Sequence, residues 1–164
     1  MKKVEVIPMI EQTMKQIEKG AFLTVKAGEK LNTMTIGWGT IGICWRKPIF
    51  MVAVRNSRHT FAIIEEAEDF TVSLPSTRMQ DELFYCGTKS GRDVDKFQEC
   101  GLKTAPGQMV ASPIIDIPGL HFECRIVYKN ALEPAKLIAD YHDLYPQKDY
   151  HTLYFGEIVA SYQL

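Results

Sequence analysis

The chain has 164 residues, 46% of them hydrophobic and 24% charged, which is the composition of one globular domain with a full core. Its 19 basic and 20 acidic residues leave a net charge of −1, and this balance argues against general nucleic-acid binding and against a polybasic membrane anchor. The clearest apolar run, residues 48–54, is far shorter than the ~20 residues of a membrane span. Because the first residues also lack the apolar stretch of a secretion signal, we expect a single cytoplasmic domain over residues 1–164, without membrane contact.

The cysteines and histidines have no spacing typical of a metal site. There is no CxxC pair and no HExxH-like pair of histidines, so we expect no bound metal. In a reducing compartment the cysteines are expected to be free and mostly buried, with a disulfide between Cys86 and Cys100 as the alternative. The residues concerned are Cys44, Cys86, Cys100, Cys124, His59, His121, His142 and His151.

The first third of the chain predicts a short helix followed by strands. Apolar residues recur at helical spacing between Met9 and Ile17, and Gly20 follows as a stop signal. Strands are predicted over residues 21–26, 32–38 and 49–55. Glycines between residues 37 and 42 make the end of the second strand irregular, and we expect a loop over residues 39–46.

The remainder of the chain predicts short helices between strands. After a polar segment the order is a helix over residues 61–67, a strand over 70–74, helices over 77–85 and 94–100, and long strands over 121–132 and 151–163. A polar, tyrosine-rich stretch separates the last two strands. Because the strands do not alternate with long helices, a doubly wound parallel sheet is disfavoured. The pattern predicts an α+β, mainly β protein built on an antiparallel barrel or sandwich.

Residues 32–38 are the first segment that can carry chemistry. Strand alternation places Thr33 and Thr35 on one face and Asn32, Met34 and Trp38 on the other. The amide and hydroxyl groups can hydrogen-bond the polar atoms of a ring, and Trp38 can form a wall for a flat ligand. An ordinary strand with a buried tryptophan is the alternative.

Residues 55–60 lie between the end of a strand and the start of a helix. Unpaired N–H groups at a helix start favour an anion, and Arg55, Arg58, Ser57 and Thr60 supply the cations and hydroxyls of a phosphate site. The alternative is a simple helix cap, with Ser57 as the cap residue and the arginines in solvent.

Residues 86–97 contain a Gly-Thr-Lys-Ser run that is not a phosphate loop, because no glycine immediately precedes Lys89. A weaker anion site remains, with backbone access at Ser90 and Gly91 and cations at Lys89, Arg92 and Lys96. A solvated charged loop is the alternative. No GxSxG motif is present, so a serine hydrolase is not predicted. Gly37, Gly39 and Gly42 have GxGxxG spacing, but no helix is predicted directly after them, so a resident dinucleotide-binding domain is not predicted either.

In this order the three segments resemble the flavin reductase-like FMN-binding split-barrel family, which includes flavoredoxins and a ferric reductase. The resemblance covers nearly the whole chain from about Gly20 onward. It rests on the order and spacing of several motifs rather than on any one of them. The matching stretches are residues 32–38, 47–55, 57–60, 68–73, 86–97, 120–124 and 151–159.

The resemblance implies an antiparallel split β-barrel with short flanking helices, and a homodimer with one FMN per subunit near the interface. The residues that match those near the flavin ring and ribityl chain are Asn32, Thr33, Met34, Thr35 and Trp38. The residues that match the phosphate end are Arg55, Ser57, Arg58 and Thr60. Those that close the pocket are Lys89, Ser90, Gly91 and Lys96. His151 matches a histidine that can face the flavin, and it is the candidate catalytic residue.

The function implied is that of an FMN-binding oxidoreductase, in which NADH or NADPH passes hydride to flavin N5. Such a protein reduces free flavin or a ferric chelate, or acts as a flavoredoxin-like electron transfer protein with a redox partner. The alternative is a non-enzymatic FMN-binding electron carrier reduced by a protein partner, and a barrel without cofactor is the third reading. The sequence departs from the family at Gly37, at His59 and over residues 39–46, where Cys44 is either a redox thiol or a buried inert one.

Overall fold

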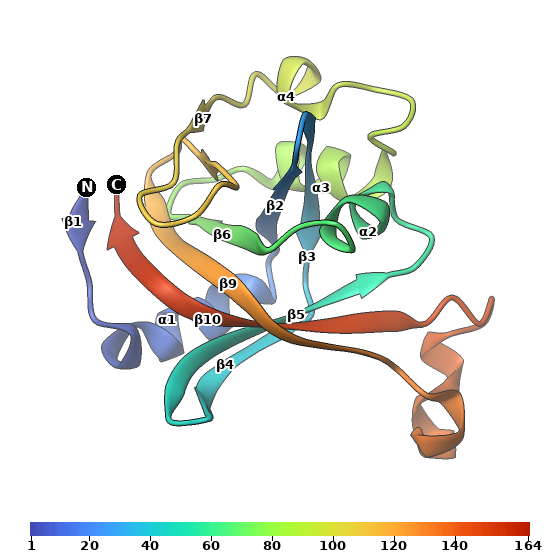
Figure 1. Ribbon diagram of the computed structural model, residues 1–164. Coiled ribbons are helices and arrows are strands. Elements are labelled where there is room, and N and C mark those ends of the chain that lie inside the picture. Colours follow the sequence, from blue (N-terminus) through green and yellow to red (C-terminus); the bar gives the residue numbers. More distant parts are fainter.

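The computed structural model describes residues 1–164 and consists mainly of strands with a few short helices (Figure 1). The helices are α1 (Val6–Ile17), α2 (His59–Ile64), α3 (Gln80–Thr88) and α4 (Lys96–Glu99), with the 3-10 turns η1 (Pro134–Lys136) and η2 (Ala139–Leu144). The strands are β1 (Lys2–Lys3), β2 (Ala21–Ala27), β3 (Lys30–Ile36), β4 (Gly39–Cys44), β5 (Lys47–Arg55), β6 (Asp69–Pro75), β7 (Thr104–Ala105), β8 (Ile114–Ile115), β9 (Gly119–Ala131) and β10 (His151–Gln163).

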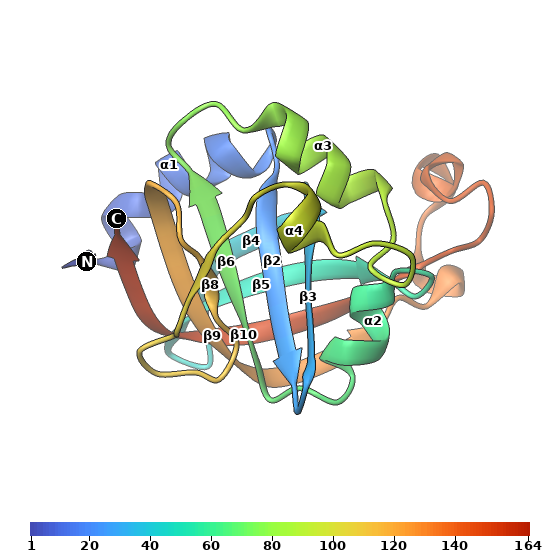
Figure 2. The ribbon, with the colours of Figure 1, turned by 90° about the horizontal axis from the view of Figure 1, so that it is seen from above.

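One antiparallel sheet runs through the molecule in the order β3-β2-β6-β9-β10-β5-β4, and β1 pairs with β10. β9 and β10 have 13 residues each, and the register between them shifts near Phe155 and Ile158. Such irregularities bend and twist a strand. The sheet accordingly folds over, so that the half containing β2, β3 and β6 crosses the half containing β4 and β5 (Figure 2).

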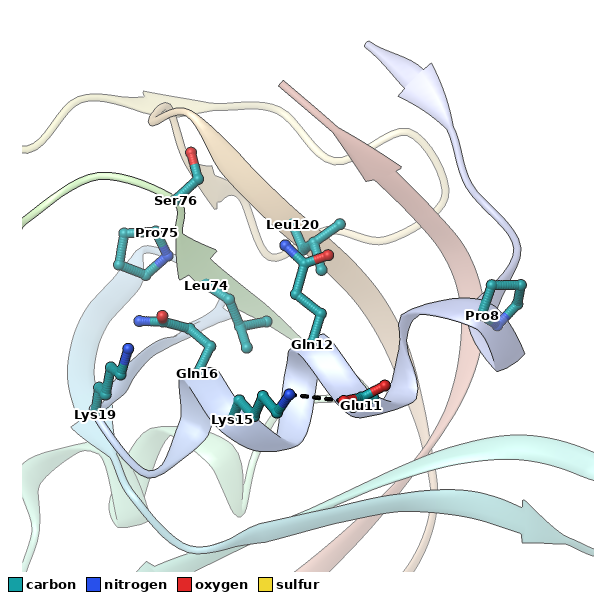
Figure 3. A pocket seen from close by; sticks show the side chains of 10 residues that line it. All are labelled: Pro8, Glu11, Gln12, Lys15, Gln16, Lys19, Leu74, Pro75, Ser76 and Leu120. Atoms are coloured by element: carbon teal, nitrogen blue, oxygen red, sulfur yellow. Dashed lines mark hydrogen bonds and ion pairs between the residues drawn. The ribbon is translucent and has the colours of Figure 1, made fainter.

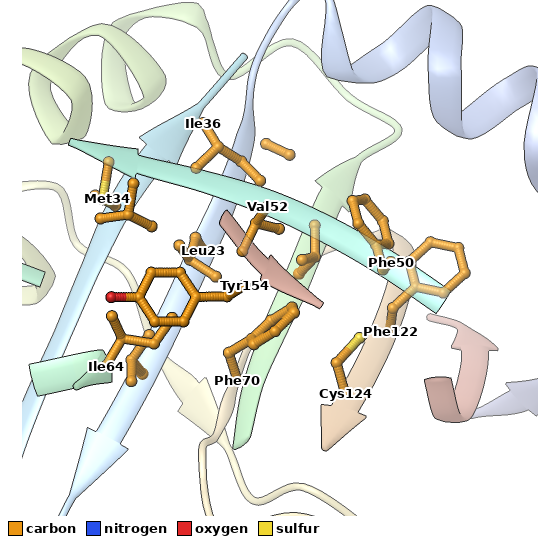
Figure 4. Packing of buried hydrophobic residues seen from close by; sticks show 14 of the residues in the cluster. Leu23, Met34, Ile36, Phe50, Val52, Ile64, Phe70, Phe122, Cys124 and Tyr154 are labelled. Carbon is orange, nitrogen blue, oxygen red and sulfur yellow. The ribbon is translucent and has the colours of Figure 1, made fainter. Parts of the chain in front are cut away.

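The main core fills the space between the two halves of this sheet (Figure 4). Phe50 from β5 and Phe122 from β9 meet edge to face, with their ring centroids 5.4 Å apart. Gly156 lets β10 approach this core closely. A Cβ atom there would lie 2.6 Å from both the Cβ of Cys124 and the ring of Phe70. A side chain at Gly156 would therefore push β10 away from the packed rings.

The helices cover the ends of the sheet rather than form a layer of their own. α1 packs on β4 and β6, and buries Thr13 and Ile17. α2, α3 and α4 all pack on β3, and Figure 2 shows α3 and α4 above β2 and β3. Because α2 follows directly after β5, this arrangement brings the residues after β5 and after α3 to one end of β3.

The predicted α+β, mainly β fold is confirmed, and each long strand and helix lies within a few residues of its expected place. The loop expected over residues 39–46 is wrong, because residues 39–44 form β4, which pairs with β5. The hairpin closes through Trp45 and Arg46, whose φ angles are +50° and +60°. A two-residue hairpin turn with both residues in the left-handed region is usually built from Asn-Gly or Asp-Gly, so this sequence carries no hairpin signal.

The cysteines are free thiols, as expected, and the alternative disulfide between Cys86 and Cys100 is absent. Cys86 and Cys124 are buried, but Cys100 is only half-buried and Cys44 is exposed. The prediction of a buried Cys44 is therefore wrong. Its physical reason is the hairpin, because the last residue of β4 lies beside an exposed turn.

Candidate functional site

Two adjoining cavities lie where α2, the end of α3 and α4 meet β3. The first, of about 110 Å³, is called here the cationic cavity. The second, of about 260 Å³, is called the aromatic cavity. Met34 and Arg58 line both, so the two cavities are neighbours along β3. The cationic cavity is lined by Met34, Ser57, Arg58, His59, Thr60, Cys86, Thr88, Lys89, Ser90, Gly91, Arg92 and Lys96. The aromatic cavity is lined by Met34, Thr35, Gly37, Trp38, Ala53, Arg55, Arg58 and His151.

Lys96 is the buried cation of the cationic cavity, with 4% of its surface exposed. Its ammonium donates to the carbonyl oxygens of Thr33, at 3.0 Å, and Cys86, at 2.8 Å. An ammonium has three donors, and no carboxylate pairs with this one. Burial is the main cause that lowers the pKa of Lys96, and the nearby charge of Arg58 adds to it. A buried cation without a counterion is costly, and an anionic ligand would provide that counterion.

Arginine side chains join the two loops that line the cationic cavity. Arg58 donates to the carbonyl oxygen of Gly87 at 2.9 Å. Arg92 donates in the opposite direction, to the carbonyl oxygen of Ser57 at 3.1 Å. Burial, followed by the charges of Arg92 and Lys96, lowers the pKa of His59. No aspartate or glutamate lines this cavity, so its interior has a net positive charge.

Asn32, Thr60 and Gly91 form a closely packed wall next to the cationic cavity. The side-chain amide of Asn32 donates to the hydroxyl of Thr60 at 2.8 Å, and both side chains are buried. The backbone of Gly91 lies against this pair, because a Cβ atom there would collide with Oδ1 of Asn32 and lie 3.0 Å from His59. Glycine at position 91 therefore lets the loop after α3 close onto β3.

Ser57 does not act as the helix cap that one reading of the sequence proposed. The cap residue of α2 is Arg58, and its side chain makes no capping hydrogen bond. The hydroxyl of Ser57 donates instead to the carboxylate of Asp149 at 2.6 Å, and its backbone N–H donates to the same carboxylate at 3.2 Å. Residues 132–150, which connect β9 to β10, are thereby tied to the start of α2. This connection is called the strap below.

The aromatic cavity is walled by Trp38 and His151. Their ring centroids lie 4.8 Å apart at an angle of 39°. Trp38 is 43% exposed, whereas His151 is 7% exposed. Nδ1 of His151 lies 2.8 Å from the hydroxyl of Tyr145 in the strap. Burial, with a further contribution from Arg55, lowers the pKa of His151 to about 4, so this imidazole is neutral at pH 7.

Arg55 lies at the aromatic cavity and not at the cationic one. Its guanidinium donates to the carbonyl oxygens of Asp149, at 3.0 Å, and Leu144, at 3.2 Å. The same group lies 5.9 Å from the ring centroid of Trp38 and 5.1 Å from that of Tyr145, within cation–π range.

The structure brings most of the predicted site residues together. Arg58, Thr60, Lys89, Ser90, Gly91 and Lys96 line the cationic cavity with Ser57, whose hydroxyl is held by Asp149. Met34, Thr35, Trp38, Arg55 and His151 line the aromatic one. Asn32 and Thr33 line neither. The hydroxyl of Thr33 is buried and bonds Thr24 and the carbonyl oxygen of Leu23.

Several lining residues were not predicted. His59, Cys86 and Thr88 lie within or beside the predicted segments, so the signal for them was present in the sequence. Gly37, between β3 and β4, and Ala53, in β5, also line the aromatic cavity, and neither has a polar side chain. Tyr145 contacts Arg55, and Asp149 contacts Ser57. Each pair is about 90 residues apart in the sequence, so no local pattern indicates these contacts.

A larger cavity, about 450 Å³, lies elsewhere (Figure 3). It is a groove between the polar face of α1 and the ends of β6 and β9, and Glu11 and Lys15 form an ion pair in it. It contains no predicted site residue and no unpartnered buried charge. None of the helices combines the length and the apolar character needed to cross a lipid bilayer.

A positively charged cavity beside an aromatic one is suited to a ligand that carries both an anionic group and a planar ring. The chain belongs to the flavin reductase-like family, because the model of the flavin reductase like domain matches residues 17–163. Its fold is the antiparallel split β-barrel of that family, with short flanking helices.

Individual relatives agree with this assignment. Flavoredoxin from Methanosarcina acetivorans is 28% identical, with a TM-score of 0.69, and the match covers 88% of this chain and 68% of that one. Flavoredoxin of Desulfovibrio vulgaris (Miyazaki F) is 25% identical, with a TM-score of 0.70 and coverage of 88% and 69%. An uncharacterised protein of Archaeoglobus fulgidus is 28% identical over 84% of this chain and 68% of its own length. A relative from Pyrococcus abyssi is matched over 66% of its length, so the chain spans about two thirds of these curated relatives.

Proposed function

We propose that this protein binds FMN across the two cavities and acts as an NAD(P)H-dependent oxidoreductase of the flavin reductase or flavoredoxin type. The observation that carries the proposal is the cationic cavity, in which the buried ammonium of Lys96 has no carboxylate partner. A phosphate monoester supplies the missing negative charge and accepts charge-assisted hydrogen bonds. The membership in the flavin reductase-like family supports FMN as the phosphate-bearing ligand.

Each end of the ligand has its own set of residues in this proposal. Arg58, Arg92 and Lys96 provide the positive charge for the phosphate, while Thr60, Ser90 and Lys89 add further donors. Gly91 and Asn32 keep the loop after α3 in place, and the carbonyl oxygen of Thr33 fixes the Lys96 ammonium. The ring end lies against Met34, Thr35 and Trp38.

The chain itself supplies binding, orientation and protection from water in this reaction. The bound flavin supplies the redox chemistry, because its ring accepts a hydride equivalent from NADH or NADPH. His151 is proposed to face the ring as a neutral hydrogen-bonding group, since its pKa of about 4 leaves no proton to donate as a cation at pH 7. Trp38 and Arg55 complete the walls around the same space.

Absorbance spectroscopy tests the proposal directly. Purified protein is titrated with FMN, and bound-flavin bands are recorded before and after anaerobic addition of NADH or NADPH. Shifted bands that bleach with either nucleotide support the reductase and identify the donor. Bound flavin that stays oxidised supports the electron-carrier alternative, with a protein partner as the donor. Absence of any FMN binding would overturn the proposal.

We also propose that the protein is a homodimer, as the family resemblance implies. An apolar patch formed by the β4–β5 turn, β9 and β10 supports this proposal. Trp45 is 58% exposed and Tyr128 48%. The rings of Trp45, Tyr128 and Phe155 lie within 6.1 Å of one another. Aromatic side chains grouped in this way are typical of interface cores.

A further inference from the structure

We propose that Arg55 acts on the ring end of the ligand and not on its phosphate, and that its charge favours the reduced, negatively charged ring over the neutral oxidised one. This inference rests on the proposed function, because it requires a flavin ring in the aromatic cavity. It differs from the assignment that chain order suggests, in which Arg55 joins Ser57 and Arg58 at the phosphate.

The register of the sheet places the Arg55 side chain at the ring end. Arg55 is the last residue of β5 and pairs directly with His151, the first residue of β10. Residues that oppose each other across antiparallel strands project to the same face of the sheet. Both therefore line the aromatic cavity. In the segment that follows β5, by contrast, the first residue that lines the cationic cavity is Ser57.

The charge of Arg55 is not neutralised by its neighbours. Its guanidinium bonds carbonyl oxygens, those of Leu144 and Asp149, and it forms no ion pair. The carboxylate of Asp149 is directed to Ser57 instead. After burial, Arg55 is the strongest cause that lowers the pKa of His151. The positive field of Arg55 thus extends into the aromatic cavity.

A positive charge at this place distinguishes between the two states of a flavin ring. Reduction adds two electrons from the donor and a proton at N5, and it leaves one negative charge on the ring while N1 stays unprotonated. The neutral oxidised ring gains little from a nearby guanidinium, whereas the reduced anion gains a direct attraction. Arg55 therefore binds the reduced ring more tightly than the oxidised one.

The test uses Arg55→Met, Arg55→Lys and Arg92→Met, with dithionite as the reductant. Arg55→Met is expected to weaken FMN and riboflavin binding by the same factor. It is also expected to lower the ratio of reduced to oxidised FMN affinity about tenfold, which is ~30 mV for a two-electron couple. Arg55→Lys keeps the charge but not both carbonyl contacts, and it is expected to restore most of the potential. Arg92→Met, at the cationic cavity, should weaken FMN binding far more than riboflavin binding.

Other outcomes would overturn the inference. It is wrong if Arg55→Met weakens FMN much more than riboflavin, or leaves the potential of bound FMN unchanged. It is also wrong if Arg55→Lys behaves like Arg55→Met, because the role of Arg55 would then be to hold the strap. Where Arg55→Met does not fold, Arg55→Gln removes the charge and keeps an amide donor for the carbonyl groups. Failure of the wild-type protein to bind any flavin would instead refute the proposed function.

Discussion

The hydroxyl of Tyr145 lies 2.8 Å from Nδ1 of His151 and joins the strap to the first residue of β10. The ring of Tyr145 also stacks on Tyr150, at 4.6 Å between centroids, and meets Trp38 edge to face at 6.1 Å. His151 is therefore enclosed by the rings of Trp38 and Tyr145. This enclosure explains why burial is the main cause of its low pKa.

The low pKa of His151 predicts a pH-dependent loss of stability. Its pKa is about 4 in the folded protein and 6.5 in a solvated chain, so the folded state binds fewer protons between these values. The stabilising contribution is present above pH 6.5 and is lost as the pH falls toward 4. Between pH 7 and pH 5 the wild-type protein should lose about 2 kcal/mol more unfolding free energy than His151→Asn.

Urea denaturation at the two pH values measures this difference. His142→Asn, at an exposed position of the strap, is the control for replacing a histidine with asparagine. Burial also lowers the pKa of His121. The effect of His121 on the pH dependence of stability is the same in all three proteins, because none of them changes this residue. Equal losses in the wild-type protein and in His151→Asn would contradict the prediction.

Replacement of Lys96 should separate ligand binding from folding. Lys96→Met removes the buried ammonium but leaves the carbonyl oxygens of Thr33 and Cys86 without their donor. We expect the unfolding free energy to fall by about 1–2 kcal/mol, because loss of these bonds is partly offset by removal of a buried charge. FMN affinity should fall at least about tenfold, and riboflavin affinity should change little. Lys19→Met, at an exposed lysine of the distant groove, should change neither affinity.

Gly91 provides a test of how closely the loop after α3 must pack. In Gly91→Ala the added Cβ collides with the Asn32 amide, so the loop moves away from β3 and the wall of the cationic cavity opens. We expect FMN affinity to fall about tenfold, a cost of ~1.4 kcal/mol. Gly42→Ala places a Cβ in open space and should bind FMN like the wild-type protein. Fluorescence titration with FMN measures both, and equal affinities would refute the close-packing argument.

The proposed dimer is tested at the apolar patch formed by Trp45, Tyr128 and Phe155. Tyr128→Glu places a charge at an exposed position of this patch, outside the main core of the single chain. If the patch is buried between two subunits, the unpaired charge should shift the protein toward the monomer. Analytical ultracentrifugation measures the masses of both proteins. A wild-type monomer, or a variant dimer of unchanged affinity, would contradict the proposal.

Much of the fold could be predicted because local patterns agreed with long-range pairing. β2, β5 and β6 are short, mostly apolar segments bounded by turn residues, and most of their residues are buried. Residues 55–60 and 86–97 could each be named as a candidate anion site from their cations and hydroxyl groups, but the residues alone did not show that the two segments meet. The family resemblance then supplied the order in which those segments meet.

The remaining parts depend on information that no local pattern contains. Arg55 lies at the aromatic cavity because it pairs with His151, 96 residues later in the chain. The sequence grouped Arg55 with Ser57 instead, because the two residues are close in chain order. The contacts of Tyr145 and Asp149 depend on how the strap folds back. β4 was missed because Trp45 and Arg46 adopt left-handed angles that usually require Asn or Gly.

The position of the strap between the two longest strands has a consequence for how the protein can diversify. β9 and β10 are held by an almost continuous ladder, and the bond from Leu132 to His151 closes that ladder where the strap leaves it. The strap projects beyond the sheet in Figure 1. Insertions, deletions or exchanges within residues 132–150 therefore leave the barrel unchanged but rebuild the outer wall beside His151. The molecule thus separates the sheet from a wall that lies outside it, and changes in the strap should alter the aromatic cavity without altering the barrel.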